Sequence, residues 1–384
     1  MGGSLFLIEL GSVVILLAIL ARVAQRAGFS PMPLYLIAGL AFGEGGLVPL
    51  VTAEGFIELG AQFGLVLLLF SLGLQFSVDE FTVSLKTNGS AGAVDALLTF
   101  VPGVLGGLLL GFEPLDAVLL GGVAYNTSSS VVARIMDELG WFGNRESPTV
   151  MAITVLEDLA MAAYLPIITI LLTGDGVAAI VTSVALAIIV VLGALAVATR
   201  FGPGLSRVVF SRSDEALLLG MIGVGLLVAG GAQRLGISAG IGAFLAGIVF
   251  SGPAADRTHY LLRPMRDVFA GVFFLFFGFQ IDPAAIPPVA VQALVLSAVG
   301  IAGKYATGHW AARRQGMGPR ARRRAGALLT PRGEFSIVIA GLAVAGGSDP
   351  SLGPLAASYV LVTAVSGPIF ARVIDRAPAG APPS

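Results

Sequence analysis

Residues 151–172 read MAITVLEDLAMAAYLPIITILL, an apolar run of membrane-crossing length that carries two adjacent carboxylates, Glu157 and Asp158. The helix is expected to begin at Ser147 and Pro148, which places these acids about 15 Å from its start at ~1.5 Å per residue. That depth is near the middle of a hydrocarbon layer ~30 Å thick. Charge at this depth is costly and usually functional, so the stretch indicates a membrane-embedded site.

The composition places the rest of the chain in the membrane as well. Of the 384 residues, 56% are hydrophobic and only 12% are charged, and the mean hydropathy is +0.93. A soluble domain of this length cannot bury so much apolar surface, so the sequence predicts an all-α polytopic membrane protein. The chain has no cysteine, which excludes disulfides and thiolate chemistry. Nothing in the charge balance points to nucleic acid.

Apolar runs separated by charged or Gly/Pro-rich turns predict roughly thirteen transmembrane helices. The predicted spans are 4–25, 29–47, 55–77, 88–112, 115–139, 147–173, 176–199, 214–233, 236–252, 264–282, 288–311, 320–346 and 352–374.

The distribution of basic residues predicts the orientation of these spans. All but three of the 22 Lys and Arg residues fall in alternate connections, and the exceptions are Arg234, Lys304 and Arg332. Cytoplasmic loops carry the excess of basic residues, so we expect the N-terminus outside and the C-terminus in the cytoplasm. The expected location is the cell inner (plasma) membrane.

An internal repeat is legible at an offset of ~205–208 residues. Ser30–Leu40 aligns with Ser238–Ile248, and Leu68–Phe76 aligns with Phe273–Ile281. An odd number of spans separates the members of each pair, so the two copies have opposite orientations. Inverted repeats are typical of secondary transporters, which bind substrate near the midplane at the repeat interface.

This repeat divides the chain into parts of one membrane transporter domain, residues 1–384. We expect repeat 1 at about 4–173, a linker helix at about 176–199, repeat 2 at about 214–374 and a short flexible tail at 375–384.

The same offset aligns two polar interruptions of apolar helices, Asn126–Val132 and Arg332–Val338. Asn126 lies in the first, and Pro331 and Gly333 break the second. Unwound backbone at membrane depth is tolerated where it lines a cavity, and its carbonyls are then available to ions. The sequence therefore predicts two crossed broken helices beside the acidic pair.

These segments together resemble the membrane domain of Kef-type monovalent cation/proton antiporters, within the cation/proton antiporter superfamily. The resemblance implies a thirteen-helix, sodium/proton-antiporter-like fold with a dimerisation domain and a mobile core domain, and a homodimer. The motifs that carry it are Phe29–Gly39, Gly64–Leu74, Ser129–Val132, Leu156–Ala160, Gly242–Gly247, Phe273–Phe279 and Arg332–Ser336.

Two departures from the Kef pattern affect the expected ion and the expected regulation. Glu157 stands where many Kef proteins carry Gln, and this pair of acids looks more like those of bacterial sodium/proton antiporters. Kef chains usually continue into a cytoplasmic regulatory domain, whereas this one ends at Ser384. We therefore expect a separate cytoplasmic regulatory subunit that docks on the basic segment Arg313–Arg324; the alternative is an exchanger limited only by protonation of Asp158.

Asp158 is the predicted carrier of the monovalent cation and the proton. A carboxylate in a partly dehydrated cavity holds a proton or a cation but not both, and competition for one site is antiport. The alternative is a structural carboxylate. The hydroxyls of Thr127 and Ser128 are further candidates for the ion site, although such groups more often join helices.

Charge compensation is expected from three residues in the second repeat. Lys304 is the best available counter-ion for Glu157, which points ~100° away from Asp158 around the helix. That pair either breaks during transport or is permanent. Arg332 and Glu334 flank the second break, where they either shape the ion cavity or satisfy helix ends and pair with Asp95 or Glu58. Asp95 has no assigned role of its own.

The sequence thus predicts a secondary transporter in the lipid bilayer that exchanges a monovalent cation for protons, with K⁺ favoured over Na⁺. It contains no phosphate-binding loop, nucleophile elbow or zinc spacing, so neither an enzyme nor a cofactor is expected. A cation channel is the alternative from another class, and it would need a selectivity filter that this sequence does not show.

Overall fold

The computed structural model describes residues 2–27, 31–43, 54–74, 88–172, 213–234, 239–250 and 253–376. In these ranges all regular structure is helical, which confirms the predicted fold class. The chain forms two compact units. The first unit comprises Met1–Leu10, Leu50–Glu80 and Ala162–Phe277, and the second comprises Gly11–Pro49, Phe81–Met161 and Gly278–Ser384. The boundaries of the two sequence repeats remain a prediction.

Every predicted span except 176–199, which lies outside the described residues, falls on helix. The helices are α1 (Gly2–Ala27), α2 (Met32–Phe42), α3 (Glu54–Leu74), η1 (Ala96–Phe100), α5 (Val101–Leu109), α6 (Pro114–Tyr125), α7 (Ser129–Glu138), α8 (Ser147–Leu172), α10 (Asp214–Arg234), α11 (Ala239–Val249), α12 (Pro253–Phe279), η2 (Pro283–Ala285), α13 (Ile286–Arg314), α14 (Pro319–Leu328), α15 (Glu334–Ala345) and α16 (Leu352–Arg376).

Several helices are shorter than predicted because glycine and proline set their ends. Within the expected span 29–47, the described helix is α2, which begins after Pro31 and ends before Gly43. Among the described residues, six helices have the length and apolarity to cross a membrane, and further helices are apolar but shorter. Short helices of this kind fit a fold that uses interrupted spans.

In the first unit, α3 packs closely against α11, and α10 packs against both. Glycines allow this approach: Gly73 faces the backbone of Phe244 and Gly247, and a Cβ at Gly73 would lie 2.9 Å from the Gly247 Cα. Apolar side chains, including Phe70 and Met221, fill the space around them. This interface is apolar and is closest at small residues, as expected where helices associate in a membrane.

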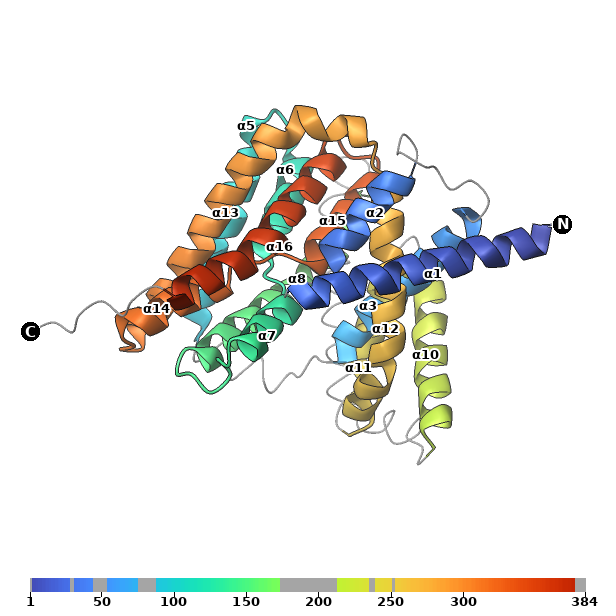
Figure 1. Cartoon of the computed structure of the whole chain (residues 1–384), viewed down its shortest axis with the longest axis horizontal. Coiled ribbons are helices and arrows are strands. Elements are labelled where there is room, and N and C mark those ends of the chain that lie inside the picture. Colours follow the sequence, from blue (N-terminus) through green and yellow to red (C-terminus); the bar gives the residue numbers. More distant parts are fainter. Residues whose placement is uncertain are drawn as a thin grey trace, which may run out of the picture. The chain divides into compact units, whose positions relative to one another are not determined.

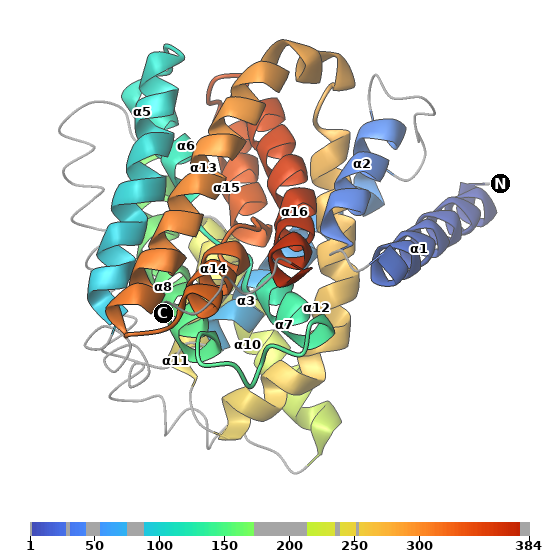
Figure 2. The same ribbon diagram turned by 60° about the vertical axis from the view of Figure 1, so that its left-hand side comes forward.

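In the second unit, α13 is the central helix and packs against α14, α16 and η1. The helices α5, α6, α13, α15 and α16 run side by side in both Figure 1 and Figure 2, and α15 contacts α6 and α16. This bundle surrounds the two predicted helix breaks and supplies Lys304 on α13 and Glu334 on α15 near them.

Candidate functional site

Two helices of the second unit are interrupted where the sequence predicts. The first ends as α6 at Tyr125 and resumes as α7 at Ser129, with extended backbone at Asn126 and Ser128. The second ends as α14 at Leu328 and resumes as α15 at Glu334. Each break leaves helix-end carbonyl and amide groups without partners in their own helix.

The two breaks cross and bond to each other. The Ser128 amide donates to the Pro331 carbonyl at 3.0 Å, and the Thr127 hydroxyl donates to the Leu329 carbonyl at 3.1 Å. The Ser128 hydroxyl donates to Glu334 Oε2 at 3.1 Å. The crossing is therefore fixed partly by its own backbone and partly by side chains.

Gly333 makes this close approach possible. A Cβ at this position would overlap the side chain of Ser128. The glycine therefore serves the contact between the two breaks as well as interrupting the helix.

Arg332 is fully buried at the second break and satisfies carbonyl groups there. Its guanidinium donates to the Tyr359 hydroxyl at 2.9 Å, to the Leu329 carbonyl at 3.2 Å, and at 3.4 Å to the carbonyls of Thr330 and Gly300. A fixed cation at the carbonyl end of α14 also complements the helix dipole. These contacts match the expectation that Arg332 satisfies a helix end.

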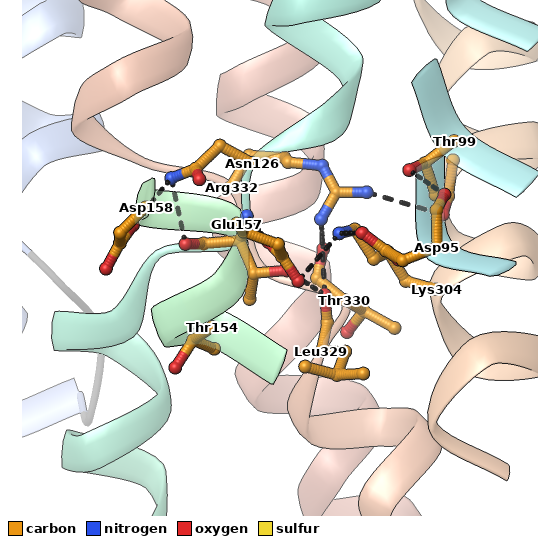
Figure 3. A network of polar contacts seen from close by, with 12 residues as sticks. Asp95, Thr99, Asn126, Thr154, Glu157, Asp158, Lys304, Leu329, Thr330 and Arg332 are labelled. Carbon is orange, nitrogen blue, oxygen red and sulfur yellow. Dashed lines mark hydrogen bonds and ion pairs between the residues drawn. The ribbon is translucent and has the colours of Figure 1, made fainter. Parts of the chain in front are cut away.

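A fully buried ion cluster lies beside the crossing (Figure 3). Lys304 Nζ is 2.6 Å from Asp95 Oδ2 and 3.0 Å from Glu157 Oε1, and all three side chains are inaccessible to solvent. The other oxygen of Glu157 accepts the Thr127 amide at the first break. The Lys304 ammonium also lies 5.1 Å from the ring centroid of Tyr125. One ammonium thus serves two carboxylates, where the sequence predicted only Glu157.

Asp158 points to a different partner from its neighbour Glu157, as the helical spacing predicts (Figure 3). Its Oδ1 accepts a long contact of 3.4 Å from Asn126 Nδ2, which also donates to the Thr127 carbonyl at 3.1 Å. None of the ion pairs found among the described residues involves Asp158. The site therefore holds two carboxylates that share one lysine, and a third, Asp158, that is in none of these ion pairs.

Sequence reasoning missed the roles of Asp95 and Tyr359. Asp95 is an acid within an apolar run, the same signal that singled out Asp158, but its partner Lys304 lies 209 residues away. Tyr359 gave no signal, because a tyrosine in a transmembrane helix is common. Glu58, the other proposed partner of Arg332, has a side chain outside the described part of the chain.

The family model described as "Sodium/hydrogen exchanger, transmembrane" matches residues 12–374. The chain belongs to this family. It is a multi-pass membrane protein of the cation/proton antiporter superfamily, which confirms the resemblance seen in the sequence.

Two relatives of this chain are named as antiporter subunits. The chain is 33% identical to the "K(+)/H(+) antiporter subunit KhtU" of Bacillus subtilis, over 96% of this chain and 93% of that protein. It is 31% identical to the "Ammonium/H(+) antiporter subunit AmhT" of Alkalihalophilus pseudofirmus, over 94% and 91% of the two chains.

The exchanger fold is also seen in a solved structure. The sodium proton antiporter MjNhaP1 of Methanocaldococcus jannaschii superposes with a TM-score of 0.72, over 97% of this chain and 98% of that one, at 15% identity. At this identity the likeness shows the fold alone.

Proposed function

We propose that this protein exchanges a monovalent cation, with K⁺ favoured, for protons, and that Asp158 is the shared site. One observation carries the proposal: of the two adjacent acids at the crossing, Glu157 has Lys304 as a counter-ion at 3.0 Å and Asp158 is in none of the ion pairs of the described residues. A carboxylate without a fixed cation must be neutralised by a proton or a transported cation when it is enclosed.

The groups around Asp158 suit a monovalent cation. Asn126 Oδ1 is buried and accepts no hydrogen bond from the described residues, and Asn126 Nδ2 is the group that contacts Asp158. The Thr127 hydroxyl donates to the Leu329 carbonyl, which leaves its oxygen lone pairs available to an ion, and the Ser128 hydroxyl donates to Glu334. Carboxylate, amide and hydroxyl oxygens are suitable ligands for hard cations.

Exchange then follows from competition at one carboxylate. A proton or a cation neutralises Asp158, and either one permits the site to be enclosed in low dielectric. An ionised Asp158 with no bound cation is disfavoured while the site is enclosed. Return of the empty site across the membrane, without a proton or a cation, is therefore suppressed. Glu157 is held by Lys304 and the Thr127 amide, and it adds negative potential that favours binding of a positive ion.

The experiment is exchange in reconstituted vesicles that contain a pH dye, stepped through K⁺, Na⁺, Li⁺ and choline. Wild-type protein should move protons on addition of K⁺, and Asp158→Asn should reduce the signal to that of empty vesicles. Asp267→Asn is a matched control, because Asp267 is exposed and pairs with Arg266 at 2.7 Å. Exchange at the wild-type rate by Asp158→Asn would remove Asp158 from the mechanism.

The names of the two relatives support K⁺ or another monovalent cation as substrate. Na⁺/H⁺ exchange is the second candidate, because the Glu157 and Asp158 pair places two acids at the site. A larger signal with Na⁺ than with K⁺ in the same vesicles would favour it. A cation channel is distinguished by currents in planar bilayers, since conductance far above carrier turnover would contradict exchange.

Assembly and orientation belong to the same proposal. We expect a homodimer in the plasma membrane, with the N-terminus outside and the C-terminus in the cytoplasm. KhtU and AmhT are both named as subunits, which supports a further subunit; we propose that it is regulatory and docks on residues 313–324. Full activity of the purified protein, unchanged by cytosolic extract, would exclude that subunit.

A further inference from the structure

Two arginines from other helices of the second unit hold the C-terminal end of α1. Arg134 on α7 donates through Nη2 to the Gln25 carbonyl at 3.4 Å, and Arg372 on α16 donates through Nη1 to the Ala27 carbonyl at 3.2 Å. Gln25 and Ala27 lie in the last turn of α1, where carbonyl groups have no partner in their own helix. The two guanidinium groups therefore cap this end of α1.

Glu138 on α7 joins the two arginines. Its Oε1 accepts Arg134 Nε at 3.0 Å, and its Oε2 accepts Arg372 Nη2 at 3.0 Å. One carboxylate and the negative end of the α1 dipole thus offset two positive charges. We call this group the α1 latch, and it consists of the side chains of Arg134, Glu138 and Arg372 with the carbonyls of Gln25 and Ala27.

The α1 latch is open to solvent, in contrast to the ion cluster at the crossing. The side-chain exposure is 28% for Arg134 and Glu138 and 34% for Arg372, whereas Lys304 and Glu157 are fully buried. Exposed ion pairs are weak, and salt screens them over a distance that falls from ~30 Å at 0.01 M to ~3 Å at 1 M. The α1 latch is therefore stronger at low ionic strength than at high ionic strength.

The α1 latch acts on the crossing through α7, which begins at Ser129 beside the first break and ends at Glu138. The helix α1 is divided between the two units, because residues up to Leu10 belong to the first and residues from Gly11 belong to the second. Alternating access moves one part of a transporter of this kind against the other. A closed latch ties α7 to α1 and so resists displacement of the crossing relative to the beginning of α1.

We propose that the α1 latch slows exchange at low ionic strength and opens as the salt concentration of the cytoplasm rises, so that ionic strength itself controls the rate. The inference rests on the proposed function. Arg134 and Arg372 belong to the basic residues expected on the cytoplasmic side, so the salt concentration of the cytoplasm is the signal.

The test is the rate of K⁺/H⁺ exchange in vesicles at low and high ionic strength. The K⁺ concentration stays fixed, and choline chloride on both faces raises the ionic strength from ~10 mM to ~500 mM. The wild-type rate should rise about threefold, which is the size of effect expected when weak exposed ion pairs are screened. Glu138→Gln should already be as fast at low ionic strength as the wild type is at high ionic strength, and should show no further rise.

Glu113→Gln is the matched control, because Glu113 is an exposed glutamate of the second unit whose side chain makes no capping hydrogen bond to α6. It should keep the wild-type response to salt. The double variant Arg134→Gln with Arg372→Gln removes the cations instead of the carboxylate and should behave like Glu138→Gln. This double variant provides the answer if Glu138→Gln does not fold.

A distance measurement follows the α1 latch without any transport. The chain has no cysteine, so spin labels can be attached at Arg26→Cys on α1 and Asp137→Cys on α7, which are both exposed positions. With Glu138 present, the distribution of distances between the labels should broaden as the ionic strength rises. With Glu138→Gln it should be broad at both ionic strengths.

An equal response to salt in wild-type protein and Glu138→Gln, or a label distance that salt does not change, would overturn the inference and leave the two arginines as caps of α1. The proposed function fails by a different result, namely exchange by Asp158→Asn at the wild-type rate, and the label distance does not depend on that result. The two failures are therefore separable.

Discussion

The α3–α11 contact in the first unit and the crossing of the broken helices in the second unit both bring two backbones close together, but by different means. In both, a glycine lets two backbones approach: Gly73 beside Gly247, and Gly333 beside Ser128. Between α3 and α11 the helices stay intact, so the interface needs only apolar contacts. At the crossing the helices are broken, and their freed amides and carbonyls require polar partners.

The difference explains why ion binding is expected at the broken helices of this apolar protein and not between its intact helices. The freed groups at the crossing are bonded by buried polar side chains such as Thr127, Glu157 and Arg332. Once charges are brought there to satisfy backbone, one further acid, Asp158, is enough to make a site for a cation or a proton.

The largest loss of stability should come from Lys304→Gln. This change leaves Asp95 and Glu157 buried without their ion-pair partner, and removal of one member of a buried ion pair costs ~3–5 kcal/mol. Glu157→Gln should cost less than half as much, because Asp95 still neutralises Lys304. Thermal unfolding in detergent measures both, and equal losses would mean that Asp95 does not share the ammonium.

A smaller loss, confined to stability, is expected from Gly73→Ala at the apolar α3–α11 contact. The new methyl meets the backbone of Phe244 and Gly247, and overpacking of this kind costs ~1–3 kcal/mol. Gly223→Ala on α10 is the control, because its Cβ meets nothing within 4 Å. Exchange per folded molecule should be unchanged in both variants. A shifted ion preference in Gly73→Ala would contradict the view that the α3–α11 contact serves packing alone.

The smallest effect is expected from Ser128→Ala at the crossing. The change removes the hydroxyl that donates to Glu334 at 3.1 Å, and a hydrogen bond of this kind contributes ~1 kcal/mol. The K⁺ concentration for half-maximal exchange should rise a few-fold if the same hydroxyl faces the ion. An unchanged value would limit Ser128 to fixing the crossing.

Much of the fold and part of the site follow from residue patterns alone. Asn126, Pro331 and Gly333 interrupt apolar helices, and local chemistry is enough to predict a break at each. The contact of Lys304 with Glu157 is expected because Lys304 is the best available counter-ion and because the resemblance to sodium/proton antiporters implies that pairing. Exchange of cations for protons at Asp158 remains a prediction.

The role of Asp95 does not follow in the same way. Its distance from Lys304 depends on the winding of η1 and on the approach that Gly303 permits, and neither is encoded in a local pattern. Helical periodicity assumes a constant turn, so a π-helical turn rotates every residue beyond it relative to that expectation. The partners of Arg332 were hidden for a related reason, because backbone carbonyls carry no sequence signal.

Competition of a proton and a cation for Asp158 is tested most directly by proton release on cation binding. Purified protein in weakly buffered detergent would receive K⁺ near the pH midpoint of exchange, with choline as the control salt. Wild-type protein should release about one proton for each K⁺ bound, because the two compete for one carboxylate, and Asp158→Asn should release none. Binding of K⁺ without proton release, or equal release from Asp158→Asn, would contradict a shared site at Asp158.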